Sequence, residues 1–200
     1  MSESWLSTSF PERLFVMGAG PSLEILYEHR HEANDWGDWA ILRSDLVQPL
    51  LEFIEPKYTI RYNSNARDRN KTYGIPIEIG PPDEWIPTQN IGEGGVSSIQ
   101  AFIYQFQNNG GKELFLFGFD GDSSGYWGKE KCPMNLVISK DCEYMNRCSS
   151  QILVKLFHIG ETRHKTMKQI SIDDLKRTYL STWTKLKVFF KKLKGNYLNA

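Results

Sequence analysis

The chain has 200 residues, of which 40% are hydrophobic and 24% are charged. This composition suits one globular domain with a sizeable core and excludes disorder as the main state. The formal net charge of zero conceals an uneven distribution, because no acidic residue follows Asp174 while seven basic residues lie from Lys176 to Lys194. The first 175 residues hold 17 basic and 24 acidic residues, so we expect an acidic domain over 1–175 and a basic tail over 176–200.

The three cysteines, Cys132, Cys142 and Cys148, are spaced in a way that matches no common zinc motif. We therefore expect reduced thiols, no metal site and a cytoplasmic location. No apolar run reaches the length of a signal peptide or the roughly 20 residues of a membrane span.

The hydrophobic pattern, taken in chain order, alternates between two kinds of segment. Short apolar runs predict strands over 14–17, 39–43, 58–62, 113–120 and 156–159, with a further strand and loop within 75–87. Helical patterns occupy 22–27, 47–53, 96–107, 144–155 and 172–194. We expect a single α/β domain of the Rossmann type, with an open, mostly parallel sheet, helices on both faces and a C-terminal amphipathic helix.

A glycine turn follows the first predicted strand, with the sequence Gly18-Ala19-Gly20-Pro21-Ser22. Glycines let a ligand approach the backbone closely, and free N–H groups at a helix start attract phosphate. Ser22 is placed to cap the helix or to donate to a phosphate oxygen. Leu23 replaces the third glycine of the dinucleotide fingerprint, which disfavours NAD. The alternatives are a phosphate-bearing nucleotide at this turn and a tight turn without a ligand.

Three motifs in this order resemble two related groups of proteins. The motifs are Gly18-Ala19-Gly20-Pro21-Ser22-Leu23 with Ala40-Ile41-Leu42-Arg43-Ser44-Asp45, then Gly94-Gly95-Val96-Ser97-Ser98, then the strand from Glu113 to Asp120. They are similar to the bacterial sialyltransferases of glycosyltransferase family 42. They also resemble the motility-accessory and archaeal pterin-diphosphokinase proteins that share the core called domain of unknown function 115. The segment Gln169-Ile170-Ser171-Ile172-Asp173-Asp174-Leu175 is also like the one with which this core often closes, so the resemblance covers about 160 residues.

The resemblance implies a nucleotide-sugar donor such as a CMP-sugar, a glycan or small-molecule acceptor, and no separate cofactor. It carries ligand contacts onto residues of the turns and loops: Gly18, Ala19, Gly20, Ser22, Asp45, Gly94, Gly95, Asp120 and Tyr126. Arg43, close to Asp45, is a further candidate for nucleotide binding. Two asparagines of the family correspond to Ala19 and Asp45, and Asp45 would repel a phosphate unless Arg43 or a metal intervenes.

The catalytic histidine of the sialyltransferases has no counterpart here, because residues 140–146 contain no histidine. A carboxylate can replace it as general base, so Asp120, Asp122 and Asp141 are candidates by position, and loop-turn chemistry is the alternative role of Asp120 and Asp122. His164 is a further candidate, and we expect its cationic neighbours Arg163 and Lys165 to lower its pKa.

Two other functions stay open. One is a nucleotide- or sugar-binding protein that lacks the catalytic base, and the other is a phosphotransferase similar to the pterin diphosphokinases, for which no paired carboxylates are present. The basic residues of 176–194 alternate with apolar ones, which suits either a helix docked on the sheet or contact with an anionic membrane surface. We expect no nucleic-acid partner, and the resemblance leaves a homo-oligomer open.

Overall fold

The computed structural model describes residues 9–42, 46–62, 73–79, 96–121, 126–128, 142, 145–146 and 149–180. The chain divides into two compact units, Met1–Gln169 and Ile170–Ala200.

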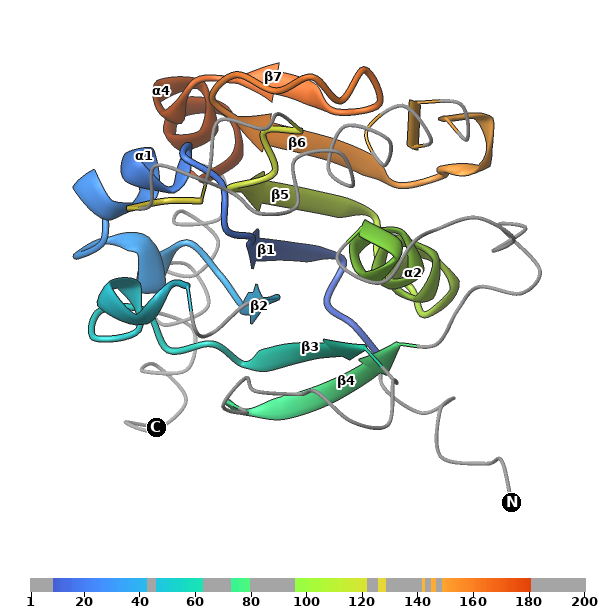
Figure 1. Ribbon diagram of the computed structural model, residues 1–200, viewed down its shortest axis with the longest axis horizontal. Helices are drawn as coiled ribbons and strands as arrows, with labels where there is room; N and C mark the ends of the chain where they lie inside the picture. The colour runs from blue at the N-terminus through green and yellow to red at the C-terminus, as the bar shows by residue number, and fades with distance from the viewer. Residues whose placement is uncertain are drawn as a thin grey trace, which may run out of the picture. The chain divides into compact units, whose positions relative to one another are not determined.

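One seven-stranded sheet has the order β4-β3-β2-β1-β5-β6-β7 (Figure 1). The strands are β1 (Arg13–Met17), β2 (Trp39–Ile41), β3 (Tyr58–Tyr62), β4 (Ile75–Ile79), β5 (Glu113–Phe117), β6 (Lys155–Ile159) and β7 (Lys168–Ile170). Every pairing among β1 to β6 is parallel. This arrangement confirms the predicted open, mostly parallel α/β sheet of the Rossmann type.

The direction of sheet growth reverses at β1. The chain adds β2, β3 and β4 on one side of β1, and then returns through the helix α2 (Val96–Asn108) to place β5 on the other side. In open α/β sheets, ligands bind outside the carboxyl ends of the strands at such a reversal. The segments that follow β1 and β5 therefore meet where a ligand is expected.

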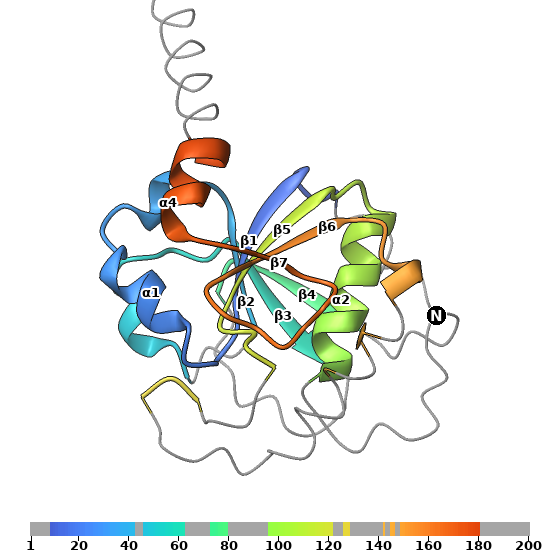
Figure 2. The same ribbon diagram turned by 90° about the horizontal axis from the view of Figure 1, so that it is seen from above.

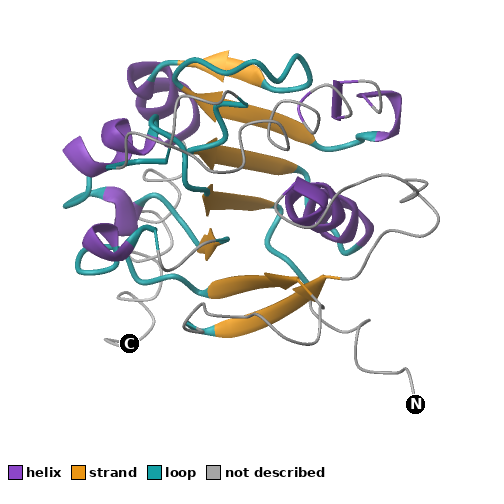
Figure 3. Cartoon of the chain, in the orientation of Figure 1, coloured by secondary structure: helices purple, strands orange, loops and turns teal. Residues whose placement is uncertain are grey.

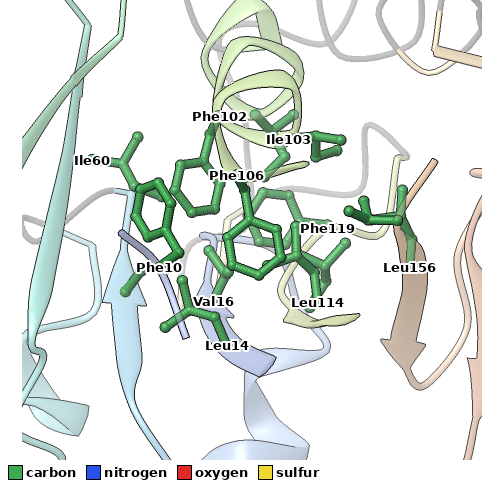
Figure 4. Packing of buried hydrophobic residues seen from close by; sticks show 14 of the residues in the cluster. Phe10, Leu14, Val16, Ile60, Phe102, Ile103, Phe106, Leu114, Phe119 and Leu156 are labelled. Atoms are coloured by element: carbon green, nitrogen blue, oxygen red, sulfur yellow. The ribbon is translucent and has the colours of Figure 1, made fainter. Parts of the chain in front are cut away.

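Along each strand, successive side chains point to opposite faces of the sheet. Leu14, Val16, Leu114 and Leu116 are fully buried in a cluster that also holds the apolar face of α2. Figure 4 shows Leu14, Val16 and Leu114 beneath Phe102 and Phe106, with Phe10 beside them in the same cluster. Burial of both faces explains the uninterrupted apolar runs of β1 and β5.

The opposite face carries an aromatic layer. Phe15 stacks on Phe115 with 5.1 Å between ring centroids, and Trp36 lies 6.0 Å from Phe117 in the same way. The helix α1 (Leu23–Glu28) lies on this side, as Figure 2 shows, with α2 on the other side of the sheet. The prediction of helices on both faces is confirmed.

Two predicted helices are wrong in extent (Figure 3). The pattern over 47–53 forms only the 3-10 turn η2 (Gln48–Leu50), which has a proline in its first turn. Within 144–155, Met145 and Asn146 are helical, but Ser149–Gln151 form the 3-10 turn η3 and Lys155 already belongs to β6, so the prediction is confirmed only in part. The short 3-10 turn η1 (Ala33–Asp35) and the strand β7 had no clear apolar pattern and were not predicted.

The second unit begins its helical segment at a serine cap. The Ser171 hydroxyl oxygen accepts the Asp174 N–H at 3.0 Å, opening α4 (Ile172–Asp174), and a π-helical turn, η4 (Leu175–Leu180), continues it. The predicted helix over 172–194 is thus confirmed as far as Leu180, and the rest lies outside the described residues. Within the described part of the chain, no helix has both the length and the apolar character that a membrane span needs.

Candidate functional site

The glycine turn after β1 is bonded directly to the end of β5. The Gly18 N–H donates to the Phe117 carbonyl oxygen at 2.8 Å, and the N–H groups of Ala19 and Gly20 donate to the Gly118 carbonyl oxygen at 3.1 and 2.9 Å. These three donors are therefore already used inside the protein, and they do not form an open phosphate cradle.

The turn after β1 and the end of β5 approach each other so closely that glycine is needed at several positions. A Cβ at Gly18 would lie 2.5 Å from the Gly118 carbonyl oxygen, and a Cβ at Gly20 would strike the Asp120 carboxylate. Gly118 itself has a φ of +76°, and a Cβ there would meet the Gly20 nitrogen at 2.9 Å. Residues with side chains could not bring the two backbones this close.

The Asp120 carboxylate lies at the start of α1. Its Oδ2 accepts the Ser22 N–H at 3.1 Å, and its Oδ1 lies 3.4 Å from His158 Nε2 but has no hydrogen-bond partner. The Ser22 hydroxyl makes no capping bond to α1; its oxygen instead accepts the Gly118 N–H at 2.9 Å. Asp120 thus takes the position that a ligand anion would have at this turn.

His158 joins these groups from the end of β6. The side chain is fully buried, with Nδ1 3.2 Å from the Gly160 carbonyl oxygen and Nε2 3.5 Å from the Ser22 hydroxyl oxygen. A carbonyl oxygen only accepts, so Nδ1 carries a proton in this arrangement. Burial lowers the pKa of His158, and the nearby Asp120 carboxylate opposes that effect. The sequence did not predict these partners of His158.

His164 lies in the segment that follows β6. Only 6% of its surface is exposed, and burial, followed by the charge of His158, lowers its pKa to about 4. The predicted direction is correct, but the predicted cause, the charges of Arg163 and Lys165, is not. His164 is therefore neutral at pH 7, and its Nδ1 has no hydrogen-bond partner.

Backbone contacts attach this segment to the end of β5. The Thr162 hydroxyl donates to the Phe119 carbonyl oxygen at 2.8 Å, and the Arg163 N–H donates to the Asp120 carbonyl oxygen at 2.8 Å. Gly121, with a φ of +69°, leaves no space for a Cβ between the His164 ring and the sulfur of Cys142, a buried side chain that accepts the Asn146 amide at 3.8 Å.

A short segment, residues 126–128, is bonded to the glycine turn. The Trp127 N–H donates to the Ala19 carbonyl oxygen at 2.8 Å, which places the predicted contact residue Tyr126 next to the turn. The structure thus brings together the following predicted residues: Gly18, Ala19, Gly20, Ser22, Asp120, Tyr126 and, on the adjoining segment, His164. Arg43, Asp45, Gly94, Gly95, Asp122 and Asp141 lie outside the described residues.

The acidic, histidine and cysteine side chains of the described segments form no group of three that could hold a metal ion.

In the sequence, the one signal for His158 is its place near the carboxyl end of an apolar strand. In the structure, it lies opposite Leu116 in the register of β5 and β6.

Comparisons with known proteins bear on the fold. No family model and no curated protein matches the sequence. The structure is similar to that of the MAf glycosyltransferase from Magnetospirillum magneticum AMB-1, with a TM-score of 0.54 and 13% sequence identity. The match covers 82% of this chain and 34% of that one, so the chain spans about a third of the length of its neighbour. At this identity the likeness shows a shared fold.

Because His164 binds its proton less readily in the folded state than at its ordinary pKa of 6.5, acid should destabilise the protein through this residue. The folded state holds fewer protons than the unfolded state between pH 6.5 and about 4, so stability falls as the pH falls through that range. We expect His164→Gln to reduce the loss between pH 7.5 and 4.5 by about 2–3 kcal/mol. Urea unfolding at both pH values measures this; an equal loss in both proteins would contradict the burial of a neutral His164.

The steric conflict between a side chain at position 20 and Asp120 predicts a coupling between them. Gly20→Ala should lower the free energy of unfolding by about 1–3 kcal/mol, and by clearly less when Asp120→Ala is also present. Gly110→Ala is the control, since its Cβ would meet nothing within 4 Å and its cost should be the same in both backgrounds. Strictly additive costs at position 20 in urea unfolding would argue against the contact.

Proposed function

We propose that this protein is a glycosyltransferase that moves a sugar from a nucleotide-sugar donor, such as a CMP-sugar, to a hydroxyl group of a glycan or small-molecule acceptor. The observation that carries the proposal is the meeting of the glycine turn and Asp120 at the reversal of strand order, where open α/β sheets bind their ligands. The fold shared with a solved glycosyltransferase supports the same choice.

The backbone bonds of the glycine turn restrict how the donor would bind. The N–H groups of Gly18, Ala19 and Gly20 already donate to the carbonyl oxygens of Phe117 and Gly118. These residues therefore allow close packing of the backbone but offer no free N–H group to a phosphate. In this proposal, Tyr126 contacts the phosphate from beside the turn. Further contacts come from Arg43, Asp45, Gly94 and Gly95, as the sequence resemblance implies.

The general base in this proposal is Asp120, with Asp122 and His164 as alternatives. Transfer forms a bond between the acceptor oxygen and the anomeric carbon, breaks the bond from that carbon to the phosphate oxygen, and moves the acceptor proton to the base. Asp120 is held by the Ser22 N–H and faces His158, which fixes its orientation. His164 is unprotonated at pH 7, but its pKa, lowered to about 4 by burial, makes it a weaker base than an ordinary histidine.

One observation favours a second candidate, a nucleotide- or sugar-binding protein without transferase activity. The free oxygen of Asp120 and the ring nitrogen Nδ1 of His164 are both buried, so neither meets solvent in this structure. Binding without transfer would need no exposed base.

A transfer assay distinguishes the two candidates. We expect at least one of CMP-, UDP- and GDP-sugars to raise the melting temperature and to release its nucleotide when an acceptor glycan is present. Asp120→Asn keeps an oxygen that accepts the Ser22 N–H but removes the base, so it should lower the rate by about 10²–10⁴. Asp38→Asn, which alters an exposed carboxylate paired with Lys57 before β2, should leave the rate unchanged.

Donor binding without nucleotide release would favour the binding protein. If no donor raises the melting temperature, with or without Mg²⁺, both candidates lose their support.

A further inference from the structure

Trp127 is held against the glycine turn and α1 by three contacts. Its backbone N–H donates to the Ala19 carbonyl oxygen at 2.8 Å, and its indole Nε1–H donates to Glu24 Oε2 at 2.7 Å. Its ring centroid lies 5.5 Å from that of Tyr27. Trp127 is only half-buried and Glu24 is exposed, so a large indole is fixed at the surface beside the candidate site.

Tyr27 is fixed in turn by Arg30. The guanidinium carbon of Arg30 lies 4.2 Å from the Tyr27 ring centroid, and Nη1 donates to the Tyr27 carbonyl oxygen at 2.7 Å. The same guanidinium carbon lies 4.9 Å from the Phe53 ring centroid. An aromatic pair whose geometry is set before a ligand arrives loses little conformational entropy on binding.

We infer that Trp127, Tyr27 and Glu24 form a carbohydrate-binding subsite at the edge of the glycine turn. The indole would pack on the apolar C–H face of a sugar ring, and Glu24 would accept a hydrogen bond from a sugar hydroxyl. The inference rests on the proposed function and adds to it the position of an uncharged sugar, which neither the fold nor the sequence resemblance assigns.

The chemistry of Glu24 favours an uncharged sugar over an anion. A carboxylate offers about four acceptor positions and no donor, and the Trp127 indole takes one of them. A phosphate or carboxylate ligand would be repelled there, whereas hydroxyl groups would donate. The subsite also adjoins the candidate base, because Trp127 bonds to Ala19 while Asp120 contacts the next residue, Gly20.

Saturation-transfer NMR with methyl β-galactopyranoside as the probe tests the subsite. We expect transfer to the C–H protons of the glycoside and a shift of the Trp127 indole N–H resonance, which Trp127→Phe identifies by its loss. Trp127→Ala should abolish the transfer, Trp127→Phe should retain most of it, and Glu24→Gln should raise Kd about 3- to 10-fold. Leu153→Ala, at a residue that is 82% exposed and precedes β6, is the control and should bind as the wild type does.

Three outcomes would overturn the subsite. The first is the absence of transfer in the wild type at about 50 mM glycoside, and the second is equal transfer in a folded Trp127→Ala variant. The third is a shift of the Trp127 resonance with cytidine monophosphate but not with the glycoside, which would mean that the indole stacks on a nucleobase.

Nucleotide-sugar binding separates this inference from the proposed function. If the donor binds but the glycoside does not, only the subsite fails. If the glycoside binds through Trp127 while no donor binds, the transferase fails and the sugar subsite stands.

Discussion

Backbone hydrogen bonds between the turn after β1 and the end of β5 determine how everything else at the site is placed. Gly18, Ala19 and Gly20 donate to two carbonyl oxygens of β5 and its exit, and one of these oxygens accepts two bonds. The segments come this close only because positions 18, 20 and 118 lack side chains. The contact sets the distance from Ser22 to Asp120, and with it the position of the carboxylate.

The polar groups gathered around this contact are mostly buried, which carries an energetic cost unless they find partners. Asp120 gains the Ser22 N–H and the proximity of His158, and His158 in turn meets Gly160. The result is a set of groups paired with one another inside the protein rather than an open anion cradle. In the proposed function, ligand recognition then falls to partly exposed residues beside the turn, which are Tyr126, Trp127 and Glu24.

The sequence predicted the parts of the structure that depend on local patterns. Buried strands and amphipathic helices have characteristic hydrophobic patterns in the sequence. These patterns predicted β1, β5, β6 and the apolar face of α2, and the glycines predicted the turn after β1. The same patterns overestimated the helices at 47–53 and 144–155, where a proline and the start of β6 intervene.

The chemistry of the site was harder to predict because it depends on contacts between distant residues. Glycine suggests close backbone approach, but the sequence does not say whether a ligand or another strand makes that approach; here Gly118 does. The sequence predicts that Arg163 and Lys165 lower the pKa of His164, whereas the structure shows that burial and then His158, from β6, lower it. Trp127 had no distinguishing pattern, since its partners Ala19 and Glu24 lie about 100 residues away.

Amide hydrogen exchange in the ligand-free protein tests the central contact most directly. If the turn is bonded to β5, the amides of Gly18, Ala19, Gly20 and Ser22 should exchange at the slow rates of the strand core. Their protection should persist when a nucleotide sugar is added. Rapid exchange of these four amides in the free protein, with protection appearing only upon nucleotide addition, would show an open phosphate cradle and contradict the account.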